Sequence, residues 1–271
     1  MLKVNHIQKN YSHFNLNCSF DVPKGTITGI IGKNGSGKTT LFKSILNLIH
    51  LDSGSISILD TDYQNVDKNK IGCTLANISL CEYLKLKDLI KLLENTYQDF
   101  DLDYFIQKCK YYQFPLDKKI NEFSTGMKAK LNVLIALAHH SQFLILDEPI
   151  TGLDPMAIQD FYSMIRKLNR EDKVAIIMVS HDLRNAVEEA NKILHLQKQV
   201  LFYGLAHDYM NSKAAGHFFH EKEQGECLPT AACHMAKNGD GLENNEQKCS
   251  CGHTHAHSHQ KIEGGNTHER A

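Results

Sequence analysis

The stretch Gly32-Lys33-Asn34-Gly35-Ser36-Gly37-Lys38-Thr39 follows an apolar segment, residues 26–31, and precedes a segment with apolar residues at helical spacing. It matches the pattern G-x-x-x-x-G-K-[ST] in the strand–loop–helix context that this pattern requires. Glycines let the backbone curl so that its N–H groups face phosphate oxygens, and the start of the helix adds a favourable dipole. The stretch therefore predicts a nucleoside triphosphate site. A chance glycine-rich turn is the disfavoured alternative, because the match is complete.

Two side chains of this loop have expected chemical roles. Lys38 is predicted to bind the β- and γ-phosphates and to take part in the reaction, and the Thr39 hydroxyl is predicted to bind Mg²⁺. The residues expected to contact the nucleotide here are Gly32, Asn34, Gly35, Ser36, Gly37, Lys38, Thr39 and Thr40.

Around the loop, short apolar runs alternate with amphipathic stretches as far as residue 215, which is typical of an α/β protein with a mainly parallel sheet. Strands are predicted at residues 4–7, 15–20, 26–31, 55–59, 143–146 and 174–179, with a late hairpin of residues 193–196 and 200–203. Helices are predicted at residues 39–49, 85–97, 102–112, 126–140, 155–169 and 183–191.

Two of these strands end in polar residues. The run 143–146 is followed by Asp147 and Glu148, and the carboxyl ends of strands in open α/β sheets form binding sites. Asp147 is predicted to hold Mg²⁺, and Glu148 to polarise an attacking water. His181 follows the run 174–179 and is predicted to sense the γ-phosphate. Solvated turn acids and a surface histidine are the structural alternatives, disfavoured beside a complete phosphate loop.

Composition limits the possible functions. The 271 residues carry 30 Lys and Arg against 31 Asp and Glu, a formal net charge of −1, which argues against a general nucleic-acid binder. No apolar run approaches the roughly 20 residues that cross a bilayer, and the N-terminus lacks a signal-peptide core. We therefore expect a cytoplasmic protein whose membrane role needs a partner. Four cysteines are expected to be free thiols: Cys18, Cys73, Cys81 and Cys109.

Taken together, the ordered motifs over about residues 1–210 resemble those of the ATP-binding subunit of an ABC transporter. Tyr11 stands where this family places an aromatic residue that stacks on adenine. Phe123-Ser124-Thr125-Gly126-Met127 takes the place of the family signature, and Thr151-Gly152-Leu153-Asp154 resembles the D-loop. His181 resembles the switch histidine.

The resemblance implies a P-loop NTPase fold of the ABC type: a RecA-like, mainly parallel sheet, a small antiparallel β subdomain, and a helical subdomain of about residues 78–135. It implies an ATPase that uses ATP and Mg²⁺ and closes head to tail with a second subunit. Ser124, Gly126 and Asp154 would then act at the partner's ATP. Hydrolysis would drive a separate permease at the cytoplasmic face of the membrane.

This chain departs from the family pattern at two points. Its signature variant, with Thr125 and Met127, resembles the drug, bacteriocin and lantibiotic export or immunity branch, which favours export. At the Q-loop, Ala76 stands where the family has Gln or Glu, so a magnesium ligand is missing there unless Asn77 substitutes.

The C-terminal residues 216–271 change character. They are rich in His, Cys, Gly and charged residues and poor in aliphatic ones, which is typical of disorder. Imidazole with thiolate suits Zn²⁺, Cu⁺ or Ni²⁺. The predicted metal ligands are Cys249, Cys251, His253, His255, His257 and His259. An unselected, solvated tail is the alternative.

Two other functions stay open. A soluble ABC ATPase, for example of the iron–sulfur assembly type, would share these motifs without a membrane partner. A metal store with a degenerate ATPase would use the C-terminal cluster. Membrane fractionation separates the first from a transporter subunit, and an ATPase assay of Glu148→Gln separates the second.

Overall fold

The computed structural model describes residues 1–74, 82–97, 99–180 and 182–219. Ten strands of this part form one sheet in the order β5-β4-β1-β2-β10-β9-β3-β8-β7-β6. The strands are β1 (Leu2–Tyr11), β2 (Phe14–Val22), β3 (Ile27–Ile31), β4 (Ser53–Ile58), β5 (Thr61–Asp62), β6 (Ile71–Thr74), β7 (Phe143–Asp147), β8 (Ala175–Val179), β9 (Lys192–Gln197) and β10 (Gln199–Leu205). The helices are α1 (Lys38–Ile45), α2 (Leu86–Thr96), α3 (Leu102–Tyr111), α4 (Thr125–Leu137), α5 (Pro155–Glu171), α6 (Leu183–Glu189), α7 (Ala206–Met210) and α8 (Lys213–Phe219).

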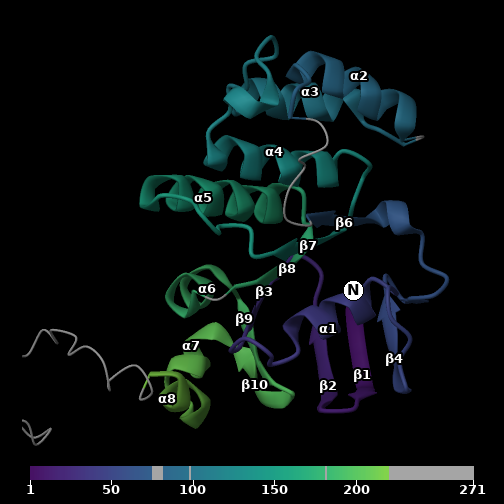
Figure 1. Ribbon diagram of the computed structural model, residues 1–271, viewed down its shortest axis with the longest axis vertical. Coiled ribbons are helices and arrows are strands. Elements are labelled where there is room, and N and C mark those ends of the chain that lie inside the picture. The colour runs from purple at the N-terminus through teal and green to yellow at the C-terminus, as the bar shows by residue number, and fades with distance from the viewer. Residues whose placement is uncertain (75–81, 98, 181, 220–271) are drawn as a thin grey trace, which may run out of the picture. The chain divides into compact units, whose positions relative to one another are not determined.

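A parallel core forms one half of the sheet. β9, β3, β8, β7 and β6 pair in parallel, in that order. Every residue of β3 and β8 is buried, as expected for parallel strands covered on both faces. In Figure 1, α4 and α5 lie beside β7 and β8, and α2 and α3 stack on α4. The predicted α/β class with a helical subdomain is confirmed.

The other half is antiparallel and joins the core through β10. β1 pairs antiparallel with β2 and β4, and both β1 and β2 alternate buried and exposed residues over much of their length, as half-buried strands do. β10 pairs antiparallel with β9 and touches β2 in parallel at Gln199 and Asn17. The antiparallel part is therefore continuous with the parallel core in one mixed sheet.

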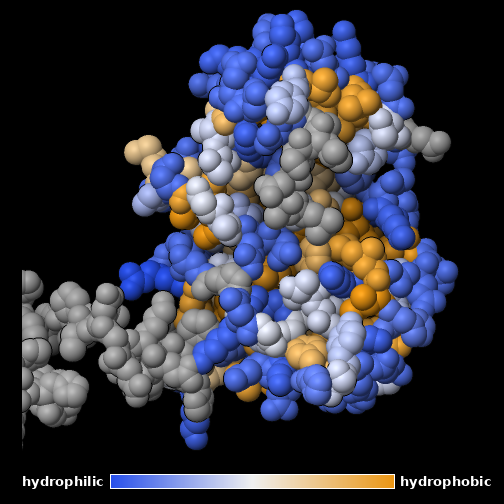
Figure 2. Space-filling view, viewed as in Figure 1, coloured by the Kyte–Doolittle hydropathy of each residue, from blue (hydrophilic) through white to orange (hydrophobic). Residues whose placement is uncertain are grey.

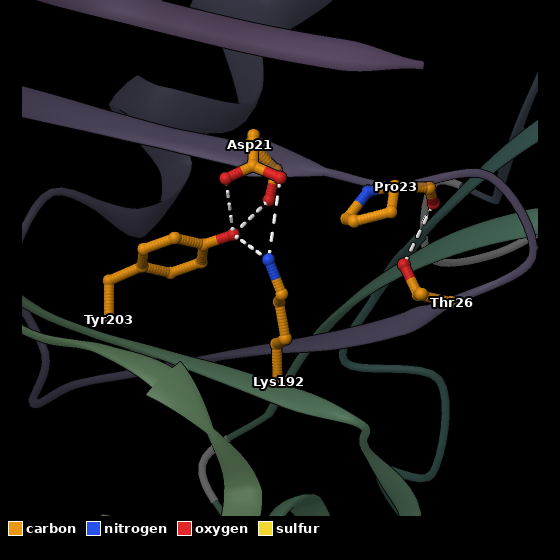
Figure 3. A network of polar contacts seen from close by, with 5 residues as sticks. All are labelled: Asp21, Pro23, Thr26, Lys192 and Tyr203. Atoms are coloured by element: carbon orange, nitrogen blue, oxygen red, sulfur yellow. Dashed lines mark hydrogen bonds and ion pairs between the residues drawn. The ribbon is translucent and has the colours of Figure 1, made fainter.

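A polar network stabilises this junction (Figure 3). The Lys192 ammonium on β9 donates to the Tyr203 hydroxyl on β10 (2.7 Å) and lies 3.3 Å from the Asp21 carboxylate on β2. The Tyr203 hydroxyl also bonds Asp21, with 2.9 Å to Oδ1. In the adjoining turn the Thr26 hydroxyl donates to the Pro23 carbonyl at 2.8 Å. Side chains thus join β2 to the consecutive strands β9 and β10, which lie far from it in the sequence.

The packed interior falls into clusters on the two faces of the sheet. One cluster runs from Phe105 of α3 through Leu134 of α4 and Phe161 of α5 to the sheet. A second includes Leu41 of α1 and Ile145 of β7, together with the inner faces of β1 and β2. The helical subdomain and α1 therefore pack against opposite sides of β7.

Several boundaries differ from the sequence prediction. The helix predicted to reach residue 49 ends at Ile45, because Asn47 adopts φ 56°, a left-handed conformation that stops a helix. The helix predicted to reach residue 140 ends at Leu137. α8 (Lys213–Phe219) runs across residue 215, up to which the sequence predicts alternating strands and helices. None of the helices within the described ranges is long and apolar enough to span a membrane.

Candidate functional site

The phosphate loop connects β3 to α1 and depends on glycine geometry. Gly32, Gly35 and Gly37 have φ values of 155°, 76° and 108°. A Cβ on Gly32 would lie 2.2 Å from the Leu196 carbonyl oxygen, and one on Gly37 would lie 2.9 Å from the Phe14 ring. The loop therefore lies directly on β9 and on the Phe14 side chain, and two of its glycines have no room for a side chain.

Lys38 is held inside this loop. Its Nζ donates to the carbonyl oxygens of Gly32 (2.6 Å) and Lys33 (3.0 Å), and the residue is only 6% exposed. Burial lowers the pKa of Lys38, while the negative charges of Glu148 and Asp147 oppose that effect. The ammonium group is thus positioned by backbone and faced by two carboxylates.

A pocket of about 240 Å³ opens beside the loop. It is lined by Phe14, Asn34, Gly35, Gly37, Lys38, Thr39, Thr40 and Glu148. The structure therefore brings most of the predicted nucleotide contacts together with the predicted catalytic carboxylate, whereas Gly32 and Ser36 do not line this pocket. Phe14, in β2, was missed by the sequence analysis. An aromatic residue only three positions after Tyr11 was the available signal.

Tyr11 lies at the end of β1, next to this pocket's aromatic wall. It is 50% exposed, and its ring centroid lies 6.2 Å from that of Phe14. The two rings provide an apolar surface at the pocket edge, suited to a flat base. The role of Tyr11 in adenine stacking remains a prediction.

Removing the Phe14 ring tests whether Phe14 forms part of the nucleotide-binding pocket. Phe14→Ala should weaken ATP binding about 5- to 20-fold, because it removes an apolar wall and the support beneath Gly37. Tyr11→Ala measures base stacking separately, and Tyr83→Ala, at an exposed tyrosine before α2, is the control. Equilibrium titration with a fluorescent ATP analogue is the measurement. Equal affinity of Phe14→Ala and Tyr83→Ala would contradict the assignment.

The acidic residues meet the loop at the carboxyl edge of the sheet. Asp147 is the last residue of β7, and Glu148 follows with φ 46°. The Glu148 N–H donates to the Val179 carbonyl at the end of β8 (3.1 Å), and its own carbonyl accepts from Thr151 (3.2 Å). These bonds hold Glu148 in a left-handed conformation that is uncommon outside glycine. Glu148 also lines a second pocket, of about 210 Å³.

The donor set fits a magnesium nucleotide. The Ser36 hydroxyl is buried within the loop with no hydrogen-bond partner in the described part of the chain, so the loop holds one unsatisfied polar atom. Thr39 lines the pocket, and Asp147 ends β7, which β8 separates from β3. These two residues would hold Mg²⁺. When bound, Mg²⁺ neutralises charge on the phosphates.

The signature and D-loop begin neighbouring helices. Ser124 caps α4, where its Oγ accepts from the Met127 N–H (3.2 Å), and Asp154 caps α5, where its Oδ1 accepts from the Ala157 N–H (2.9 Å). A Cβ on Gly126 would lie 2.9 Å from the Ala157 Cβ. The two helix starts therefore pack in contact, and Gly126 has a packing role besides its predicted role at ATP.

This contact predicts a rescue experiment. Gly126→Ala should destabilise the protein by about 1–3 kcal/mol, because two rigid methyl groups would overlap. Adding Ala157→Gly should recover most of that loss, whereas Ala157→Gly alone should cost about 1 kcal/mol through its helix propensity. Urea unfolding measures both. Independent, additive losses in the double variant would refute the contact.

Other predicted residues lie outside the described part of the chain. These are His181, Ala76 and Asn77, and the C-terminal cluster Cys249, Cys251, His253, His255, His257 and His259. Cys81 also lies outside it, whereas Cys18, Cys73 and Cys109 are free thiols, as predicted. Within residues 1–74, 82–97, 99–180 and 182–219, no group of three or more His, Cys, Asp or Glu residues could hold a metal ion.

Comparison with known proteins identifies the family. The family described as "ABC transporter" matches residues 16–151, which include the phosphate loop, the signature and the two acids. This chain belongs to the ABC transporter ATP-binding family. It is therefore an ATP-binding subunit and an ATPase. The matched residues contain the motifs for ATP binding and for ATP hydrolysis.

Relatives within the family serve different cargoes. The chain is 30% identical over 228 residues to the zinc uptake system ATP-binding protein ZurA of Listeria monocytogenes, covering 78% of this chain and 88% of that protein. It is 31% identical to the lantibiotic transport ATP-binding protein SrtF of Streptococcus pyogenes, covering 69% and 82%. The solved dimeric cassette MJ0796 shares the fold, with a TM-score of 0.63, 22% identity, and coverage of 76% and 99%.

Proposed function

We propose that two copies of this ATPase, or this chain and a paired ATPase subunit, close head to tail around ATP and drive a separate membrane permease. Each ATP would lie between the phosphate loop of one subunit and Ser124 of the other. The observation that carries this proposal is the start of α4. Ser124 is an exposed N-cap, and the first turn of α4 presents backbone N–H groups that suit a phosphate. The ATP held by the same subunit's phosphate loop is not the one that these groups would bind.

The surface around Ser124 supports a subunit contact. Asp154 and Met156 at the start of α5 are exposed, Met156 at 75%, and the Gly126–Ala157 contact joins them to α4. A large exposed apolar side chain beside two helix N-termini suits a partner that brings both an apolar surface and a phosphate. The dimeric state of the MJ0796 cassette is consistent with this arrangement.

Ser124→Arg tests the arrangement. The substitution should reduce ATP hydrolysis at least about 100-fold, because a bulky side chain at the cap blocks approach of the second subunit's triphosphate. ATP affinity of the single subunit should stay within about twofold, since the subunit's own loop is untouched. Ser163→Arg, on the exposed face of α5, is the control. Loss of ATP affinity in Ser124→Arg, or unchanged hydrolysis, would argue against trans binding.

For the membrane partner, the helical subdomain is the proposed docking surface. Figure 2 shows hydrophobic residues at the surface of this subdomain. Tyr83 and Leu92 are two large apolar side chains that are exposed in it. The protein would then be peripheral, at the cytoplasmic face of the membrane. Sedimentation with membranes that contain the permease tests this against the soluble ABC ATPase alternative. Complete recovery in the soluble fraction would favour the alternative.

The direction of transport is proposed to be export. The Ser124-Thr125-Gly126-Met127 signature and the relationship to SrtF support it. Metal-ion uptake is the second candidate, supported by the relationship to ZurA and by the His- and Cys-rich residues 249–259. Identifying the co-purifying permease and measuring ⁶⁵Zn²⁺ accumulation in cells with and without Glu148→Gln separates the two.

We also propose that the C-terminal cluster binds Zn²⁺, Cu⁺ or Ni²⁺, because thiolate and imidazole ligands suit these ions. Equilibrium dialysis of the full chain against a chain lacking residues 222–271 is the test. Equal metal binding by both chains would contradict the proposal. An ATPase rate that responds to metal only in the full chain would add a regulatory role, and identical responses would exclude one.

A further inference from the structure

β9 and the turn after it form the support beneath the phosphate loop. Gly32 lies against the Leu196 carbonyl, as its 2.2 Å Cβ distance indicates. The Lys198 N–H, in the turn between β9 and β10, donates to the Ser36 carbonyl at 2.7 Å. Ile31, the last residue before the loop, pairs in register with His195 of β9. The position of β9 therefore sets the position of the loop.

A buried polar contact joins β9 to helix α7. The Tyr209 hydroxyl lies 3.0 Å from Nδ1 of His195. His195 is 3% exposed and Tyr209 is fully buried, with its ring against Phe202 at 5.2 Å between centroids. Burial raises the pKa of Tyr209 to about 12, so the hydroxyl keeps its proton at neutral pH. A buried polar pair of this kind is costly to break on one side only.

The apolar residues packed around Tyr209 connect this contact to the phosphate loop and to the start of α6. Tyr209 belongs to one packed cluster with Ile31, at the entrance to the phosphate loop, and Leu183, the first residue of α6. α6 begins directly after Asp182, which follows the predicted switch position. Helix α7 thus packs in one cluster with Ile31, which leads into the phosphate loop, and with Leu183, which begins α6.

We propose that Tyr209 and His195 are positioning residues for nucleotide binding: their contact fixes β9 beneath the phosphate loop and makes helix α7 part of the ATP site's support. Neither residue touches the nucleotide. Loss of the Tyr209 hydroxyl breaks this polar link between α7 and β9, so β9 is held less firmly beneath the loop. Gly32 and Ser36 then move with β9, because Gly32 lies directly against the Leu196 carbonyl and the Ser36 carbonyl is hydrogen-bonded to the Lys198 N–H.

Tyr209→Phe tests the proposal in the full chain. We expect the Kd for ATP, measured by titration with a fluorescent analogue, to rise about fivefold, while kcat at saturating ATP stays within about twofold. The matched control is Tyr203→Phe, which removes the hydroxyl of the Asp21–Lys192 network (Figure 3). Lys192 is the first residue of β9, at the opposite end of the strand from Leu196, which supports the loop. Tyr203→Phe should lower the melting temperature without changing the Kd.

A double variant separates positioning from general destabilisation. His195→Leu with Tyr209→Phe removes both partners, so its effect on the Kd should be no larger than that of the more damaging single variant. Three outcomes would overturn the proposal: an unchanged Kd in Tyr209→Phe, an equal rise in Tyr203→Phe, or additive effects in the double variant. Because hydrolysis at saturating ATP is read separately, failure of the subunit-pairing proposal would not produce any of them.

Discussion

Lys38→Ala is expected to abolish ATP binding. The ammonium is buried, is oriented by the Gly32 and Lys33 carbonyls, and faces Asp147 and Glu148. Its removal takes away the positive charge that meets the phosphates and leaves two carboxylates facing a triphosphate. A loss of at least about 100-fold in affinity follows from a charge-assisted contact in a partly buried site.

The experiment needs controls for charge and for folding. Lys38→Met keeps the length of the side chain and should lose ATP as completely as Lys38→Ala, because the charge is what matters. Lys43→Ala, on the exposed side of α1, should bind ATP normally. Titration with a fluorescent ATP analogue, with melting curves to verify folding, is the measurement. Retained binding by Lys38→Met would refute the electrostatic role of Lys38.

Glu148→Gln is expected to bind ATP but to hydrolyse it about 10²- to 10⁴-fold more slowly, the range for loss of a general base. The bonds that hold this residue to Val179 and Thr151 are made by its backbone, so they survive the substitution, and glutamine keeps the shape of the side chain. The substitution removes the proton acceptor and, with it, the negative charge that faces Lys38. Since hydrolysis would no longer open the closed state, ATP should convert this variant to a stable dimer.

Gel filtration with and without ATP measures the trapped dimer, and phosphate release measures hydrolysis. Glu94→Gln, on the exposed face of α2, is the matched control and should behave like the wild type. A Glu148→Gln chain that binds ATP yet stays monomeric would contradict the proposed pairing. A Glu148→Gln variant that still hydrolyses ATP at the wild-type rate would show that Glu148 is not the general base.

The α/β fold and the phosphate site were predictable because their signals are local. β3, β7 and β8 are continuous apolar runs, and buried parallel strands are read directly from such runs. The turn chemistry of Gly32 to Thr39 is likewise contained in eight consecutive residues. Asp147 and Glu148 were found because they end a strand of this kind.

The missed features depend on contacts between distant segments. Phe14 lines the pocket beside the phosphate loop because β2 passes beside Gly37, and its closeness to Tyr11 in the sequence was only a weak signal for that place. The early end of α1 was set by the backbone of Asn47, which overrode the apolar spacing beyond it. Gly126 was assigned to ATP alone, because its contact with Ala157 exists only when α4 meets α5.

The amino-acid sequence by itself determined that this protein binds a nucleoside triphosphate and has ABC-type motifs, because each motif acts through neighbouring residues. Only the tertiary structure decided what lies around them: Phe14 at the pocket, β9 beneath the loop, and Tyr209 against His195. The physical reason is that close packing and buried hydrogen bonds join residues that are far apart in the chain. Such pairs produce no short-range pattern in the sequence.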